Sequence, residues 1–331
     1  VLKNYDFNVL LVERVRSAYK IHTDSGNFCL KKVSRGYRKS KKSFYISKHL
    51  KDNGFSNVAD YYPTKKNKLF VKINDTVYYL TYWIEGREAD FKIPYEVLKC
   101  AEMLAEFHNH AKGFKKTKSI RIRSYYDKWT KIFERSIKEI HSFIIKIDKL
   151  DIKTEFDYIY KENIDYYVQE AKQAIEILKH SNCSLLRKHQ KNQRYVCHDS
   201  YYYQNILIDK TDKMYIVDLE SCCYNLPMSD LGKFIRRVLS KSKYKWDFDF
   251  CRKIIESYSR VRPLSKAEYC LLLAMLVFPH KFWKLGIKRY VKNKKWNEAR
   301  YMKKLRKIIK YSNYKKEFIE CYVSFYNLQI L

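Results

Sequence analysis

Glycine and proline are scarce in this chain of 331 residues, which contains only seven glycines and five prolines. That scarcity excludes collagen-like and glycine-rich repeats and leaves little room for flexible linkers. No uninterrupted run of eighteen apolar residues occurs, so we expect no membrane span, and the first residues do not resemble a signal peptide. The nine cysteines include no C-x-x-C pair. Free thiols in a reducing compartment are therefore expected rather than disulfides or a zinc site.

Acidic residues are also few, because 36 Asp and Glu stand against 68 Lys and Arg and give a formal net charge of +32. A chain of this charge is attracted to polyanions whatever its fold. The excess is densest in 281–316, where aromatic residues are interleaved with the basic ones. Two interpretations remain open: a surface that binds nucleic acid or another polyanion, or an amphipathic helical region with solvated lysines. In the second, which we favour, the packed apolar side consists of Met302, Leu305, Ile308 and Ile309.

The residues best suited to chemistry are concentrated in 195–220. His198 opens a polar, aromatic loop that ends at Asn205, and two short apolar runs separated by a charged turn lead from there to Asp218. This pattern predicts a loop followed by a β-hairpin, which brings Asn205 and Asp218 together. An amide oxygen beside a carboxylate suits Mg²⁺, the metal that phosphoryl transfer requires.

The hydrophobic pattern changes along the chain from that of strands to that of helices. The first eighty residues predict strands and one helix, with Lys31 in the third strand. From Pro94 onward, apolar residues recur at helical spacing. The predicted strands cover 9–12, 18–22, 28–33, 69–73 and 76–83, and the helix covers 41–53.

Residues 195–237 resemble the catalytic loop and metal-binding segment of the aminoglycoside phosphotransferase and choline kinase group. In that group the loop reads H-G-D-x-x-x-x-N and is followed thirteen residues later by an Asp in a hydrophobic strand. His198, Asn205 and Asp218 match in identity and spacing. More narrowly, CHDSYYYQN followed by IVDLESCCYNLPMSDLGKFIRR is similar to the CotS-type spore coat proteins of endospore-forming bacteria. The likeness extends over most of the chain and is weaker before residue 80.

The resemblance implies an α+β, bilobal, protein-kinase-like fold. Its small, mostly β N-terminal lobe with one helix would cover residues 1–84. Its larger, mostly helical C-terminal lobe would cover residues 85–331 and contain the catalytic-loop hairpin. In such a fold Asp230 would brace the catalytic loop.

The resemblance also implies ATP and Mg²⁺ as cofactors. Lys31, or Lys32 one position later, would bind the nucleotide phosphates, and Asn205 and Asp218 would bind the metal. The backbone of the segment between the lobes would bind the adenine through Ile84, Glu85 and Gly86.

Three features depart from the pattern of the group. The catalytic base is expected five residues before Asn205, where this chain has Ser200, and the neighbouring carboxylate is Asp199. A serine hydroxyl is too weak a base at neutral pH to replace it. No glycine precedes Gly26, so a glycine-rich phosphate loop is missing, and the predicted helix 41–53 has no Glu to pair with Lys31.

We therefore expect a kinase-like spore coat component whose catalysis is degenerate and whose role is structural or regulatory. By resemblance it would be made in the mother-cell cytoplasm and deposited on the spore coat with other coat proteins. The first alternative is an active ATP-dependent phosphotransferase acting on a small-molecule or protein hydroxyl, with His198, Asp199 and Ser200 as candidate catalytic residues. The second alternative is a protein that binds polyanions or nucleic acid through 281–316.

Overall fold

The computed structural model describes residues 1–34, 37–180 and 183–329. Contacts between residues divide the chain into two compact units. The first unit joins residues 1–124 to 193–225, and the second joins 125–192 to 226–331. The catalytic-loop hairpin therefore belongs to the same unit as the N-terminal strands. The division into lobes at residue 84 stays a prediction.

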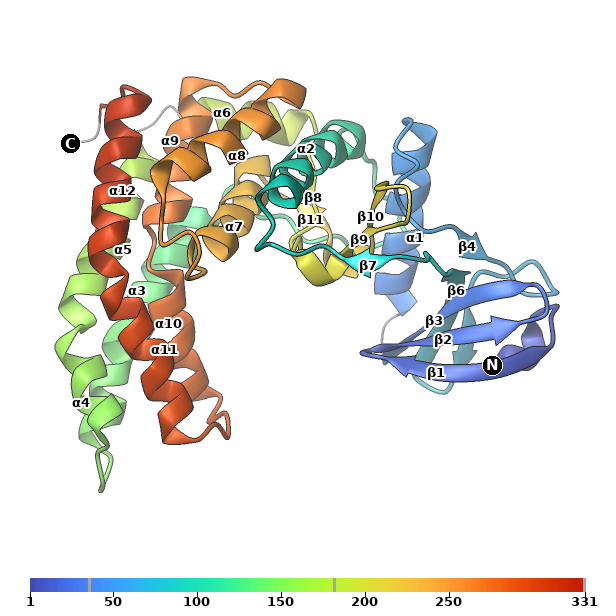
Figure 1. Cartoon of the computed structure of the whole chain (residues 1–331), viewed down its shortest axis with the longest axis horizontal. Helices are drawn as coiled ribbons and strands as arrows, with labels where there is room; N and C mark the ends of the chain where they lie inside the picture. The colour runs from blue at the N-terminus through green and yellow to red at the C-terminus, as the bar shows by residue number, and fades with distance from the viewer. Residues whose placement is uncertain (35–36, 181–182, 330–331) are drawn as a thin grey trace. The chain divides into compact units, whose positions relative to one another are not determined.

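The first unit begins with a six-stranded antiparallel sheet in the order β1-β2-β3-β6-β4, and β5 also pairs with β6 (Figure 1). The predicted strands are present, although several bounds differ. Alternation along the strands places Ile21, Phe28, Leu30 and Leu80 in one core together with Tyr5. The strands are β1 (Val9–Val15), β2 (Ala18–Thr23), β3 (Gly26–Ser34), β4 (Tyr61–Tyr62), β5 (Val71–Ile73) and β6 (Thr76–Tyr82).

Two helices of the first unit pack on each other, α1 (Tyr37–Asp52) and α2 (Pro94–Ala111). Proline is favourable at the start of α2, because the N–H that it lacks would have no partner within the helix. The buried stripe of α1 has helical spacing but an unusual composition, since it contains a lysine and three serines. Its members are Ser40, Lys42, Ser43, Ile46, Ser47 and Leu50.

The catalytic-loop hairpin forms as the sequence predicts, from β9 (Ile206–Ile208) and β10 (Met214–Ile216). β7 (Arg87–Glu88) pairs with the other side of β9. The close approach of the two segments requires glycine at position 86, because a Cβ atom there would lie 2.5 Å from the carbonyl oxygen of Ile208. A small sheet of β8 (Val196–Cys197) and β11 (Cys223–Tyr224) and two short turns, η2 (Tyr203–Asn205) and η3 (Leu219–Ser221), complete this region.

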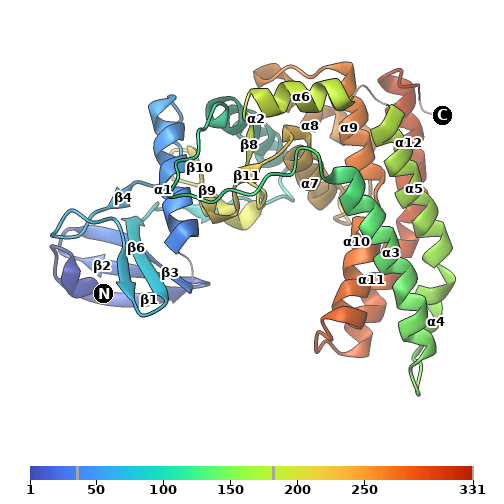
Figure 2. The same ribbon diagram turned by 180° about the vertical axis from the view of Figure 1, so that it is seen from behind.

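The second unit is helical in the part that the structure describes (Figures 1 and 2). Its central core is rich in aromatic side chains and joins α3, α4, α5, α10 and α11. The helices are α3 (Trp129–Asp148), α4 (Glu155–Glu162), α5 (Ile164–His180), α6 (Cys183–Asn192), α7 (Pro227–Leu239), α8 (Phe248–Val261), α9 (Lys266–Val277), α10 (His280–Gly286), α11 (Glu298–Lys310) and α12 (Ser312–Phe325), with a π-turn at Ile287–Val291.

One helical stretch in the described part of the chain, Lys266–Val291, is long and apolar enough to cross a membrane by length and composition alone. Its most apolar window has a mean hydropathy of 1.4 and is 67% buried within the protein. α9 packs against α5, α6 and α7, which explains why it is apolar on all sides. This is the pattern of a core helix.

The basic stretch 281–316 covers most of α10, the π-turn, α11 and the start of α12. Met302 and Leu305 are buried in the aromatic core, and Ile308 and Ile309 pack against it. The predicted apolar side of this region is therefore confirmed. Many of its lysines lie elsewhere, around a cavity described below.

Candidate functional site

Lys31 and Asp218 lie together in the first unit. The Lys31 ammonium, on β3, is 3.4 Å from a carboxylate oxygen of Asp218, at the end of the hairpin. Burial alone would lower the pKa of Lys31, but the Asp218 carboxylate, together with Cys29 and Glu220, more than offsets it, so the pKa lies above its ordinary value. Lys32 is exposed. The structure thus places Lys31, rather than Lys32, beside the proposed metal-binding carboxylate.

Asp218 has an unusual backbone conformation. Its φ of 66° and ψ of 57° lie in the left-handed region, which few residues other than glycine adopt readily. Asn205 lies close by along the backbone, since its carbonyl oxygen accepts a hydrogen bond of 3.0 Å from the N–H of Val217. The Asn205 amide nitrogen donates to the carbonyl oxygen of Ser200 at 2.9 Å. This leaves the amide oxygen as the atom of that side chain suited to a metal.

His198 is fully buried, and both of its ring nitrogens contact the backbone. Nε2 lies 3.0 Å from the carbonyl oxygen of Val217, which can only accept, so this nitrogen carries the proton. Nδ1 is then free to accept from the N–H of Ser200, at 3.3 Å. A neutral His198 therefore holds the catalytic loop against the hairpin and has no nitrogen left to act as a base.

A cavity of about 220 Å³ lies against some of these residues. Lys31, Asn205, Asp218 and Ile84 line it, whereas Asp199 and Ser200 are absent from its lining. Glu85 and Gly86 line a separate hollow against the Asp209–Thr211 turn, where Ile84 also contributes. Of the predicted catalytic, phosphate, adenine and metal residues, the structure gathers these four around one space.

An ion pair that no sequence motif indicated lies at the same cavity. Arg16 and Ser17 form the tight turn between β1 and β2, within the stretch that contains no glycine, and Arg16 has a φ of 57°. The Arg16 guanidinium is 2.7 Å from a carboxylate oxygen of Glu88 on β7, and both residues line the cavity. Arg16 thus places a positive charge beside the cavity, whereas a glycine-rich loop would offer backbone N–H groups to phosphate.

Lys42 was also missed, because one lysine among so many carries no signal. It is 4% exposed on α1, and its ammonium donates to the carbonyl oxygens of Glu220 at 2.7 Å and Cys222 at 2.6 Å. The Glu220 carboxylate in turn accepts from the Tyr79 hydroxyl at 2.9 Å. α1 is therefore tied to the segment after Asp218 by a lysine, although it has no acid to pair with Lys31.

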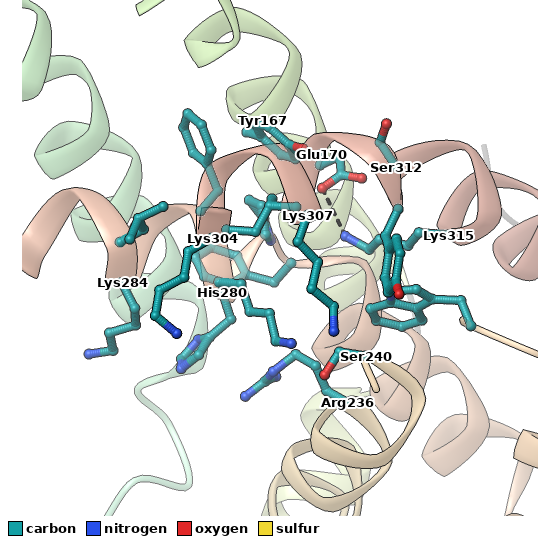
Figure 3. A pocket seen from close by; sticks show the side chains of 18 of the residues that line it. Tyr167, Glu170, Arg236, Ser240, His280, Lys284, Lys304, Lys307, Ser312 and Lys315 are labelled. Atoms are coloured by element: carbon teal, nitrogen blue, oxygen red, sulfur yellow. Dashed lines mark hydrogen bonds and ion pairs between the residues drawn. The ribbon is translucent and has the colours of Figure 1, made fainter. Parts of the chain in front are cut away.

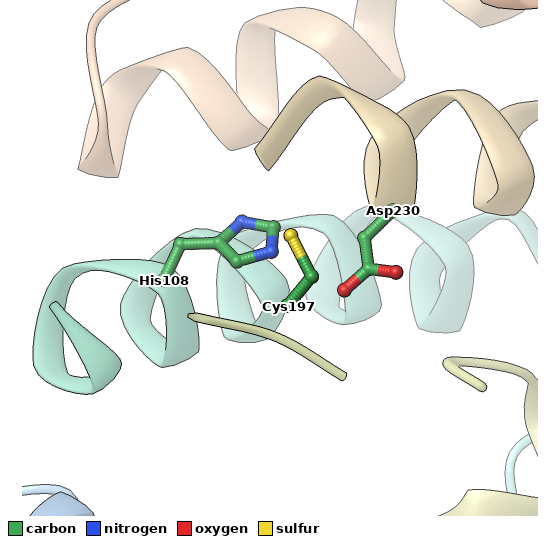
Figure 4. A group of neighbouring side chains, drawn as sticks. All are labelled: His108, Cys197 and Asp230. Carbon is green, nitrogen blue, oxygen red and sulfur yellow. The ribbon is translucent and has the colours of Figure 1, made fainter. Parts of the chain in front are cut away.

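Three further buried side chains offer metal-binding atoms, but we assign no metal to them. His108 lies on α2 and Cys197 on β8 of the first unit, and Asp230 lies on α7 of the second (Figure 4). Each already takes part in an interaction within the protein. The predicted bracing role of Asp230 stays a prediction.

Comparison with known proteins identifies the family. The model of the family described as "Spore coat putative kinase YutH" matches residues 1–322. The chain belongs to this family. It is also similar to spore coat protein S of Bacillus subtilis strain 168, with 24% identity over 313 residues that cover 92% of this chain and 86% of that protein. The predicted resemblance to spore coat proteins of the kinase-like group is confirmed.

The YutH family chain shares its fold with phosphotransferases. An aminoglycoside phosphotransferase from Alicyclobacillus acidocaldarius superposes with a TM-score of 0.85 at 18% identity, covering 99% of this chain and 95% of that one. The spectinomycin phosphotransferase APH(9)-Ia, whose structure contains ADP and spectinomycin, superposes with a TM-score of 0.66 at 15% identity, covering 99% and 96%. The α+β fold is therefore the bilobal, kinase-like fold that the sequence predicted.

Proposed function

We propose that this YutH family protein is a spore coat component that binds ATP with Mg²⁺ in the cavity of its first unit. We further propose that it is degenerate as a phosphotransferase, so that its role is structural or regulatory. One observation carries the proposal: Lys31, Asn205 and Asp218 line the cavity, whereas Ser200 stands where the base belongs.

The residues present fit a nucleotide and a metal ion. Lys31 would bind phosphate oxygens, and the Asn205 amide oxygen and the Asp218 carboxylate are hard oxygen donors of the kind that Mg²⁺ takes. When bound, Mg²⁺ would neutralise phosphate charge. APH(9)-Ia, which shares the fold, was solved with ADP. Ile84 and Trp83 would lie against the adenine ring of the nucleotide, since both residues line the cavity.

The residues present fit phosphoryl transfer poorly. An acceptor hydroxyl needs a group that takes its proton, a step usually worth about 10²–10⁴-fold in rate. Ser200 is too weak a base, and His198 uses both ring nitrogens on the backbone. Asp199 is the remaining carboxylate, but it is absent from the cavity lining. Slow turnover or none is the expected result.

Calorimetric titration with ATP in the presence and absence of Mg²⁺, followed by an ATP-hydrolysis assay in the same buffer, tests the proposal. We expect Mg²⁺-dependent binding without appreciable turnover, and loss of binding in Asp218→Asn. Asp212→Asn is the matched control, because Asp212 lies in the exposed turn of the same hairpin and also has a positive φ. No binding by the unaltered protein would refute the nucleotide site.

Rapid turnover that disappears in Asp199→Asn would instead establish the active phosphotransferase. The coat assignment has its own test, since a fluorescent fusion in sporulating cells should collect at the spore surface. A fusion that stays dispersed in the mother cell would contradict that part of the proposal. Unaltered localisation of the Asp218→Asn fusion would separate coat assembly from nucleotide binding.

A further inference from the structure

The second unit contains a cavity of about 340 Å³ that is distinct from the nucleotide site and lies wholly within that unit (Figure 3). It is bounded by α5, α7, α10, the π-turn, α11 and α12. Most of its polar lining is cationic. The cations are Arg236, Lys281, Lys284, Lys288, Lys304, Lys307 and Lys315.

The negative charge in the lining is far smaller. Glu170 is the one acidic residue among the described residues that line the cavity. Its carboxylate is 2.8 Å from the Lys315 ammonium, which also donates to the carbonyl oxygen of Val277 at 2.6 Å. This pair is internally neutral, so the other six cations have no counter-charge in the cavity lining. Figure 3 shows Lys304, Lys307 and Arg236 extending toward one region beside that pair.

The positive charges around the cavity lower one another's pKa values. Desolvation and the neighbouring Lys307 and Arg236 lower the pKa of Lys281 to about 7, although water still reaches its side chain. Desolvation, with nearby cations, also lowers the pKa values of Lys284 and Lys288. Like charges held this close destabilise the folded chain unless an anion compensates them. The arrangement therefore has an energetic cost that anion binding would offset.

We propose that this cavity binds a compact organic molecule that carries two or more phosphate groups. A volume of about 340 Å³ lies within the range of roughly 300–1,000 Å³ for small-molecule sites. Six cations can neutralise several phosphate charges, and the Arg236 guanidinium suits phosphate oxygens. An organic part of the ligand would be held by the aromatic lining, which consists of Tyr167, Trp246, Phe278, Phe282 and Tyr311.

A polynucleotide is the competing occupant. It would use the outer basic surface of 281–316 rather than the cavity, so lysines on either side of α11 would contribute alike. α11 permits this distinction, since Lys304 and Lys307 line the cavity, whereas Lys303 and Lys310 are also exposed but do not line it. Two double substitutions on one helix therefore remove the same charge from different places.

The decisive experiment is calorimetric titration with inorganic tripolyphosphate in EDTA, using the full chain that carries Asp218→Asn. Without metal and without Asp218, the nucleotide site does not contribute, so failure here and failure of the proposed function can be told apart. We expect saturable binding that weakens by about tenfold or more in Lys304→Gln/Lys307→Gln, since two charge-assisted contacts are lost. Lys303→Gln/Lys310→Gln should change the affinity by less than about twofold.

Absence of saturable binding to the unaltered cavity would overturn the proposal. Equal weakening by the two double variants would also overturn it, because the attraction would then come from the whole basic surface. A short DNA duplex added as competitor distinguishes a site for a small phosphorylated molecule from a site for a polynucleotide. Displacement of tripolyphosphate by the duplex, with equal sensitivity to both double variants, would assign the region to nucleic acid.

Discussion

Lys31 and Asp218 form an ion pair whose Nζ and Oδ1 atoms are 3.4 Å apart, on a strand of the N-terminal sheet and at the end of the catalytic-loop hairpin. The pair holds a cation and an anion on one wall of the cavity, at the cost of occupying both groups with each other. A nucleotide would offer phosphates to Lys31 while Mg²⁺ offers charge to Asp218. Lys31 and Asp218 would then exchange each other for phosphate and Mg²⁺, and both charged groups would stay paired.

Lys31→Met should weaken Mg²⁺-dependent ATP binding by about tenfold or more, because a charge-assisted contact to phosphate is worth about 1.5–3 kcal/mol. Lys32→Met is the matched control, since Lys32 is the next residue of β3 but is exposed. Calorimetry on both variants measures the difference. Similar weakening by the two would indicate a general charge effect instead of a contact.

Glu88→Gln should strengthen ATP binding by about two- to fivefold. The substitution removes the carboxylate that holds the Arg16 guanidinium at 2.7 Å and leaves that cation free to meet phosphate. The gain is small because a pair with this much exposure is worth about 0–1 kcal/mol. Glu13→Gln serves as control, since Glu13 pairs with His22 and does not line the same cavity. Unchanged affinity in Glu88→Gln would show that the pair does not restrain Arg16.

Lys42→Met should lower the free energy of unfolding by about 1–3 kcal/mol, because two carbonyl oxygens would lose their ammonium donor. Chemical denaturation followed by circular dichroism measures the loss. Lys39→Met, at an exposed position of the same helix, should change stability by less than about 0.5 kcal/mol. If nucleotide affinity fell in Lys42→Met at a temperature where the variant is folded, the lysine would also position Asp218.

Lys315→Met should destabilise the protein by about 3–5 kcal/mol, since it leaves the Glu170 carboxylate buried without its partner. The double variant Lys315→Met/Glu170→Leu should recover most of that stability, because no uncompensated charge remains. Thermal denaturation of the single and double variants tests the coupling. A double variant as unstable as the single one would show that packing, rather than charge, is lost.

Raising the pH from 7 to 8 should increase the melting temperature. Desolvation, together with Lys307, Arg236, Lys304 and Lys241, lowers the pKa of Lys281 to about 7, whereas a lysine in the unfolded chain keeps about 10.4. Between these values the unfolded state binds more protons, so the free energy of unfolding rises with pH. The rise should be smaller in Lys281→Met.

The predicted rise in melting temperature applies only up to about pH 8, because cysteine ionisation opposes it at higher pH. Unfolded cysteines ionise near 8.5, whereas burial raises the pKa values of Cys100 and Cys251 in the folded protein, and this favours unfolding at higher pH. Lys303→Met, at an exposed position, should leave the slope between pH 7 and 8 unchanged. A melting temperature that falls over this interval would contradict the assigned role of Lys281.

The sequence was informative where a local pattern determines the structure. Two short apolar runs separated by a charged turn predicted β9 and β10, and the spacing of His198, Asn205 and Asp218 resembled that of the catalytic loop of the kinase-like group. The α+β fold followed from the same evidence. The roles assigned to these residues in nucleotide and metal binding remain predictions.

The residues that the sequence did not reveal act through distant partners. Arg16 and Glu88 meet because β7 returns beside the first turn, and neither lies in a motif. Lys42 looks like any other lysine of a basic helix until the carbonyl groups of Glu220 and Cys222 are placed against it. Composition cannot distinguish a solvated lysine from a buried one when both occur on an amphipathic helix.

The first unit folds from two segments of the chain that are synthesised at different times. Residues 1–124 leave the ribosome well before 193–225, and the whole of 125–192 must emerge between them. At about 5–20 residues per second, the nascent N-terminal sheet waits seconds for the hairpin that carries Asp218. A chain that stops before Gln193 has Lys31 but none of its carboxylate partners. Binding of nucleotide would therefore select chains whose synthesis has passed residue 225.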